Sequence, residues 1–115
     1  MNSGRLRSRI KIYEYKNTVD EDGIEGEESL TLYSTVWADI RNINGKEYFE
    51  ASKNNVRAEK KIIIRYIKNL DPSIDNRATQ KFKILYNNTF YNILYIDNIQ
   101  ERKKYMEILV ESEPI

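Results

Sequence analysis

The sequence predicts a small all-β domain, a mainly antiparallel barrel or sandwich of six strands that occupies residues 1–115 as one unit. Residue types that fit a pleated strand dominate: 25 residues are Ile, Val or Thr and nine are Tyr, against 13 that are Ala, Leu or Met. Apolar and polar residues alternate in most of the segments between turns. Because no βαβ spacing is present, the strands are expected to be antiparallel.

The first expected strand covers residues 9–16, with Ile10 and Ile12 on one face and tyrosines on the other. Segment 17–29 follows and carries six acidic residues, two glycines and no basic residue. Like charges repel, and the segment has little apolar surface to bury. We therefore expect a long acidic loop near 17–29 that is mobile in the isolated subunit.

The second expected strand shows the clearest alternation in the chain. Apolar residues fall on even positions over eleven residues, with Ser34 as the exception, and this length can bend around a barrel: Leu30, Leu32, Val36, Ala38 and Ile40. Trp37 falls on the opposite face and is interpreted as a core residue. One short helix is expected near 46–54, where Asn44 can cap the first turn and Lys46 and Glu50 have i,i+4 spacing.

Four further strands complete the count. They are expected at 56–68, 82–86, 90–99 and 105–111. Pro72 follows the first of them and cannot donate a ladder hydrogen bond, so the strand must end before it. Asn87 and Asn88 tolerate positive φ and predict a tight turn.

Composition excludes most catalytic chemistry. The chain has no Cys and no His, which removes disulfides, thiol nucleophiles, imidazole bases and the zinc, haem and iron–sulfur sites that need them. The acidic segment has no apolar walls that would raise the pKa of a carboxyl group. Thr18, Asp20 and Asp22 match part of a calcium-loop spacing, but Thr holds the first position and Ser29 the last. We therefore expect no catalytic residue, no cofactor and no metal site.

Charge and hydropathy also bear on partners. The net charge of +1 argues against a dedicated polyanion binder. The basic segment 57–65 and the many tyrosines keep one alternative open, a small β-barrel nucleic-acid-binding protein. No run approaches 18 apolar residues, so no membrane association is expected. The basic start at 1–9 lacks the apolar region of a signal peptide, which predicts a protein that is cytosolic where it is made.

Several segments, in order, resemble the head–tail joining proteins of long-tailed bacteriophages and prophages, also called head-closure proteins or head–tail adaptors. The similar segments are 7–12, the acidic gap at 20–28, 35–40 with its Trp-Ala pair, 44–51 with its Gly-x-Glu, 62–66 with its Ile-Arg-Tyr, 90–93 and 102–109. The likeness covers nearly the whole chain. One departure is the connection 71–80, which is shorter and more regular in many relatives.

The resemblance implies a structural virion protein of a tailed phage or prophage. Such a protein forms part of the head–tail connector, closes the DNA exit channel after packaging and provides the surface to which the tail attaches. Its implied partners are copies of itself in a homo-oligomeric ring, the portal or connector ring protein, the tail-completion protein and passing duplex DNA, held by weak non-specific contact. The free subunit can be a monomer. The implied location is the virion connector and, during assembly, the host bacterial cytoplasm.

Segregated charge suggests where subunits meet. A ring brings unlike surfaces together around a circle, so an acidic segment and basic segments within one chain can pair between copies. The insertion 42–54 is a second candidate, because its aromatic residues could anchor it against a neighbour. The residues predicted to form subunit or partner interfaces are Asp20, Glu21, Asp22, Glu25, Glu27, Glu28, Lys46, Glu47, Tyr48, Phe49, Arg57, Lys61 and Arg65.

Overall fold

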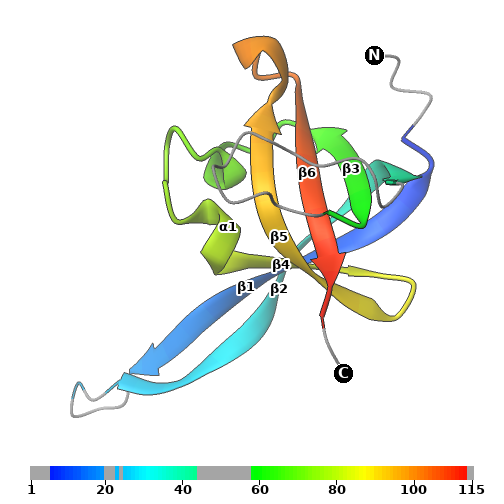
Figure 1. Cartoon of the computed structure of the whole chain (residues 1–115). Coiled ribbons are helices and arrows are strands. Elements are labelled where there is room, and N and C mark those ends of the chain that lie inside the picture. Colours follow the sequence, from blue (N-terminus) through cyan, green and yellow to red (C-terminus); the bar gives the residue numbers. More distant parts are fainter. Residues whose placement is uncertain (1–5, 20–22, 24, 44–57, 114–115) are drawn as a thin grey trace.

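The computed structural model describes residues 6–19, 23, 25–43 and 58–113. Within them, six strands form one closed antiparallel barrel in the order β1-β2-β3-β6-β5-β4 (Figure 1). The strands are β1 (Ser8–Val19), β2 (Glu25–Asn42), β3 (Lys60–Arg65), β4 (Phe82–Tyr86), β5 (Thr89–Asn98) and β6 (Tyr105–Ser112). The barrel closes where β1 pairs with β4, in a register that places Ile12 opposite Ile84. The prediction of an antiparallel six-stranded barrel is confirmed.

An aliphatic core fills the barrel. Alternate residues of each strand point inward, as the period of two requires, and most of them are β-branched. The buried members from the strands are Ile10, Ile12, Ala38, Ile62, Ile64, Phe82, Ile84, Tyr91, Ile93, Ile96, Met106, Ile108 and Val110. Leu70 and Ala78, from the connection between β3 and β4, are also fully buried, so this connection covers part of the core.

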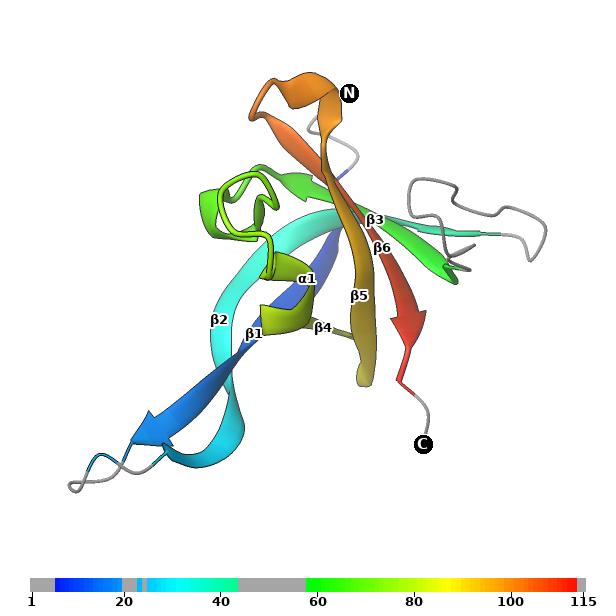
Figure 2. The same ribbon diagram turned by 60° about the vertical axis from the view of Figure 1, so that its left-hand side comes forward.

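The two longest strands extend beyond the barrel as a two-stranded arm (Figures 1 and 2). Pairing of β1 with β4 ends at Glu14, whereas pairing of β1 with β2 continues to Val19 opposite Glu25. The predicted long loop at 17–29 is therefore wrong for 17–19 and 25–29, which are strand. The composition argument weighed side-chain repulsion alone, but the backbone groups of the two strands pair with each other whatever their side chains carry.

A β-bulge at Tyr33 changes which side of β2 faces the core. The register moves from Ile12 opposite Ser34 to Tyr13 opposite Leu32, which leaves Tyr33 as the extra residue. Its ring packs edge-on against Phe82, with 5.1 Å between the ring centroids. Leu32 is 50% exposed. The prediction that Leu32 shares the core face of Val36 and Ala38 is wrong, because the bulge reverses the alternation.

Trp37 also corrects a prediction. Its neighbour Ala38 is fully buried, and Trp37 points to the outer face with 51% of its surface exposed. It is therefore not a core residue. The cause is the alternation itself, because the barrel has a single interior and the odd positions of β2 after the bulge lie outside it.

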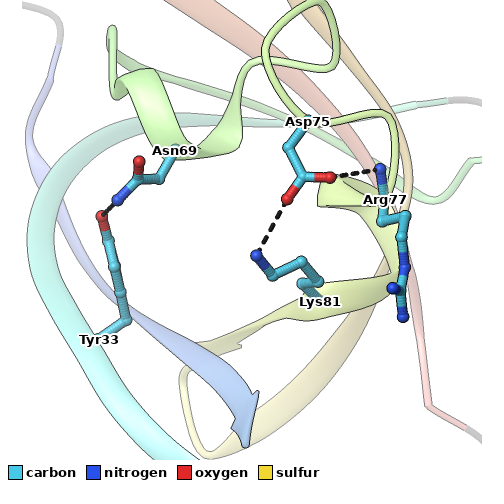
Figure 3. Close-up of polar contacts among 5 residues, drawn as sticks. All are labelled: Tyr33, Asn69, Asp75, Arg77 and Lys81. Atoms are coloured by element: carbon cyan, nitrogen blue, oxygen red, sulfur yellow. Dashed lines mark hydrogen bonds and ion pairs between the residues drawn. The ribbon is translucent and has the colours of Figure 1, made fainter.

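Two short helical turns lie near the core, in the connection from β3 to β4. This connection contains η2 (Lys68–Leu70) and α1 (Ala78–Lys81), and side-chain hydrogen bonds hold it (Figure 3). Asn69 donates to the Tyr33 hydroxyl at 2.8 Å, and Asp75 accepts from the Arg77 amide and from Lys81, each at 2.9 Å. The helix predicted near 46–54 lies outside the described residues.

The remaining hairpins follow the predicted order. Asn87 and Asn88 have φ of 52° and 62° in the turn between β4 and β5, as predicted. The turn η3 (Ile99–Glu101) leads from β5 towards β6. The third strand begins at Lys60, later than the predicted 56, and ends at Arg65. No helix in the described part of the chain is long and apolar enough to cross a membrane.

Candidate interaction surface

A row of residues crosses the outer face of four strands. Arg9 of β1 lies opposite Trp37 of β2, and Arg65 of β3 lies opposite Tyr105 of β6. The two pairs are adjacent, because Ala38 pairs with Ile64 and these are the next residues along β2 and β3. Residues opposite each other share a face and lie within side-chain reach.

The Arg9 guanidinium lies over the indole ring of Trp37, 4.5 Å from the ring centroid. This cation–π contact orients the exposed ring and contributes about 0.5–1 kcal/mol at an exposed site. Beside it is a surface pocket of about 400 Å³ lined by Leu6, Arg7, Trp37 and Arg65. We call Leu6, Arg7, Arg9, Trp37 and Arg65 the arginine–tryptophan patch.

Basic character continues from this patch around the barrel. A neighbouring pocket of about 410 Å³ is lined by Arg65, Tyr66, Lys103, Lys104 and Tyr105. Guanidinium groups bind carboxylates or phosphates through paired hydrogen bonds, and the indole adds apolar contact. The surface as a whole suits a ligand that is acidic and partly apolar.

Only part of the predicted interface set can be placed. Arg65 lies in the arginine–tryptophan patch. Lys61 lies four residues before Arg65 on β3, and its Nζ is 3.9 Å from Oε1 of Glu107. Glu25, Glu27 and Glu28 belong to the part of β2 that forms the arm, so they do not lie near Arg65 in the same subunit. The other predicted residues are outside the described ones: Asp20, Glu21, Asp22, Lys46, Glu47, Tyr48, Phe49 and Arg57.

The structure adds residues that the predicted set omitted. Arg7, Arg9 and Trp37 complete the patch around Arg65, and only the register of β1, β2 and β3 brings them together. A sequence signal existed in the basic segment at the start of the chain and in the single tryptophan. Without the strand register, the sequence does not show that the basic segment and Trp37 lie side by side.

A second polar cluster surrounds Asp71, which is 2% exposed. One carboxylate oxygen accepts from the Tyr66 hydroxyl at 2.6 Å, and the other accepts from the amide and the hydroxyl of Ser73 at 2.9 and 2.8 Å. The Tyr66 hydrogen bond is the main cause that holds the pKa of Asp71 below its usual value, with the Ser73 bonds adding to it against the effect of burial. The same bond raises the pKa of Tyr66. Asp71 is thus a charged acceptor at neutral pH that fixes the connection after β3.

Lys83 is a buried basic residue of β4, with 4% of its surface exposed. Its ammonium lies 5.6 Å from the ring centroids of both Tyr15 and Phe90 and forms an ion pair with Glu113. Burial alone lowers the pKa of Lys83, but the bonds to Glu113 and Tyr15 outweigh it and the pKa is raised. The amine stays protonated and is no nucleophile at neutral pH. In the described part of the chain no cluster of acidic side chains could hold a metal ion.

Comparison with known proteins assigns the family. A sequence model of the phage head completion proteins matches residues 1–113. The chain belongs to this family. The resemblance to head–tail joining proteins found in the sequence is thereby confirmed, and the chain is a structural protein of the phage head, located in the virion.

Two solved structures share the fold of this head completion protein. The solution structure of a protein from Shigella flexneri 2a has 28% sequence identity, covers 97% of this chain and 96% of its own, and has a TM-score of 0.69. A chain in the virion of a native gene transfer agent particle has 14% identity, covers 95% and 96%, and has a TM-score of 0.61. Among curated proteins, no match to this chain is found.

Proposed function

We propose that this head completion protein is part of the head–tail connector, where it closes the DNA exit channel after packaging and offers the surface to which the tail attaches. The observation that carries the proposal is the family match over residues 1–113. The shared fold with a chain of a gene transfer agent virion supports a place in an assembled particle.

The proposed partners are further copies of the chain in a ring, the portal or connector ring protein and the tail-completion protein. Closure of the barrel supports this arrangement, because a closed barrel leaves no strand edge in its body for uncontrolled pairing. Contacts must then use side-chain faces or the projecting arm. Both are specific surfaces that can repeat around a ring.

Passing duplex DNA is a proposed weak ligand. With a net charge of +1, the chain cannot neutralise many phosphates, so the expected dissociation constant is at the non-specific level, about 10⁻⁴–10⁻⁶ M or weaker. The exposed Trp37 between arginines favours the alternative of a nucleic-acid-binding barrel, because bases stack on such rings. Titration of the protein with single-stranded and duplex DNA separates the two, since tight binding supports only the alternative.

Deletion of the gene in the phage that encodes it, with complementation from a plasmid, tests the proposal. The expected product is a population of heads that have packaged DNA, lack tails and lose their DNA to nuclease. Electron microscopy and nuclease protection measure these outcomes. Normal tailed particles from the deletion would remove the proposed role, and heads that never fill would assign the protein to packaging instead.

A further inference from the structure

We propose that the arm of one copy docks on the arginine–tryptophan patch of the next copy, so that the chain assembles head to tail. This inference rests on the proposed function, because it specifies the contact that builds the proposed ring. We define the arm as residues 15–19 of β1 together with 25–32 of β2. It consists of the paired strand ends that extend past the barrel (Figure 2).

The arm exposes apolar side chains on one face. Tyr13 pairs with Leu32 and Tyr15 pairs with Leu30, so the two leucines and the two tyrosines share a face. Leu30 is 36% and Leu32 50% exposed. A two-stranded ribbon is marginally stable in water unless its apolar face packs against something, so this face has a physical reason to bind a partner.

Charge identifies that partner as another copy of this chain. The arm as defined carries three glutamates, Glu25, Glu27 and Glu28, and a single basic residue, Lys16. The arginine–tryptophan patch presents three arginines around an exposed indole, and guanidinium groups pair well with carboxylates. One surface is acidic with exposed leucines, and the other is basic with an exposed tryptophan, so each matches the other in charge and in polarity.

The match cannot be made within one subunit. The patch lies at the start of the β1/β2 pair, where Arg9 is opposite Trp37, and the arm ends where Val19 is opposite Glu25. Ten residues of extended strand separate Arg9 from Val19, which is about 33 Å at the rise of a β-strand. A paired ribbon of this length cannot fold back on itself. Two unlike surfaces at opposite ends of one molecule give a heterologous contact, which closes as a ring when the rotation permits.

Disulfide trapping tests the contact directly, because the chain contains no cysteine of its own. Leu30→Cys introduces a thiol at an exposed position on the apolar face of the arm and leaves Leu32 in place, and Thr35→Cys places one at an exposed position two residues from Trp37 on the same face. Lys68→Cys, exposed on the connection after β3, replaces Thr35→Cys in a matched control. Mild oxidation at high protein concentration should link Leu30→Cys to Thr35→Cys at least about tenfold faster than to Lys68→Cys, as expected for a specific interface.

A chain that carries both Leu30→Cys and Thr35→Cys reports the geometry of the contact. Head-to-tail docking yields a ladder of covalent oligomers larger than dimers on a non-reducing gel. A product that stops at dimers would overturn the head-to-tail geometry, and equal linking to Lys68→Cys would overturn the contact itself.

Charge reversal separates this inference from the proposed function. Reversing Arg9 and Arg65 to Glu, or Glu25 and Glu28 to Lys, should each weaken self-association at least about tenfold at low salt, because several exposed ion pairs become repulsive. A chain with both reversals should regain association. In the complemented phage, single reversals that still give tailed particles would overturn the docking contact while the proposed function stands. If the Arg9 and Arg65 reversal lowers single-stranded DNA binding and leaves self-association unchanged, the patch is a nucleic-acid site and the inference fails.

Discussion

Replacement of Asp71 by Asn tests the polar cluster that anchors the connection between β3 and β4. The substitution keeps the shape of the side chain and removes its charge. Three donors point at the carboxylate, the Tyr66 hydroxyl at 2.6 Å and the Ser73 amide and hydroxyl at 2.9 and 2.8 Å. An Asn side chain can still accept the two Ser73 bonds through its oxygen, but its NH₂ group replaces the acceptor for Tyr66.

The magnitude follows from these bonds. Hydrogen bonds to a charged group contribute about 1.5–3 kcal/mol to stability, against about 0.5–1.5 kcal/mol for neutral ones. Ser73 is exposed and Tyr66 half-buried, so water compensates part of the loss. We expect Asp71→Asn to lower the free energy of unfolding by about 1–3 kcal/mol and Tm by roughly 5–15 °C. Asp97→Asn removes an exposed carboxylate nearby and should change the free energy of unfolding by less than about 0.5 kcal/mol.

The pH dependence makes the prediction specific to the charge. The folded-state pKa of Asp71 lies below its usual value of 3.8, so its contribution is fully present above pH 3.8 and is lost as the pH falls through the folded pKa. Urea unfolding followed by far-UV circular dichroism, at pH 7 and at steps below pH 4, measures the difference between wild type and variant. This difference should narrow in the acid range. A constant difference, or a loss at pH 7 no larger than that of Asp97→Asn, would refute the role of the carboxylate.

Three further perturbations test other parts of the fold. Glu113→Gln removes the ion pair of buried Lys83 and should cost about 0.5–1 kcal/mol of unfolding free energy, because the Glu113 side chain is 43% exposed and solvent screens the pair. Since the pKa of Lys83 is raised above its usual 10.5, urea unfolding should show this cost in full below pH 10.5, and the cost should disappear as the pH rises further. Tyr33→Ala should cost about 2–3 kcal/mol by emptying the space against Phe82, whereas Tyr33→Phe, which loses only the hydrogen bond with Asn69, should cost under about 1 kcal/mol in thermal unfolding. Trp37→Ala should change Tm by only a few degrees, because half of the side chain is already exposed; a large drop in a melting experiment would mean that the patch is part of the core.

Strand positions were predictable because local alternation reports them. The segment 82–86 has the same bounds in the sequence prediction and in β4, and the Asn87-Asn88 turn has the positive φ values that its residues favour. The exposure of Leu30 and Leu32 was not predictable from this alternation. A single bulge residue moves every preceding side chain of the strand to the opposite face. Tyrosine is not a residue type that marks a bulge, so only the pairing of β2 with β1 reveals the bulge at Tyr33.

The candidate surface was predictable only in part. Basic residues near the start of the chain and in 57–65 indicated where positive charge would gather, and Arg65 lies there. That Arg9 stacks on Trp37 depends on the β1–β2 register, a long-range property that alternation along one strand cannot give. No sequence signal predicted the burial of Lys83. Its neighbours along β4 are apolar, and the strand face that carries Lys83 would be exposed if the rings of Tyr15 and Phe90 did not flank it.

Weak docking between free subunits follows from the size of the exposed features. Leu30 and Leu32 are already partly covered, and completing their burial gives about 1 kcal/mol each, from the roughly 1.5–3 kcal/mol of a full side chain. Exposed ion pairs at the patch add about 0.2–1 kcal/mol each. The sum is comparable to or below the cost of about 4–15 kcal/mol for fixing one molecule on another. One such contact therefore leaves a free subunit mainly monomeric. When two copies are held side by side on the connector, the same contact between them becomes effectively intramolecular and its strength rises with the effective concentration. Assembly is then expected at the filled head rather than in solution, which is consistent with the proposed closing of the channel after packaging.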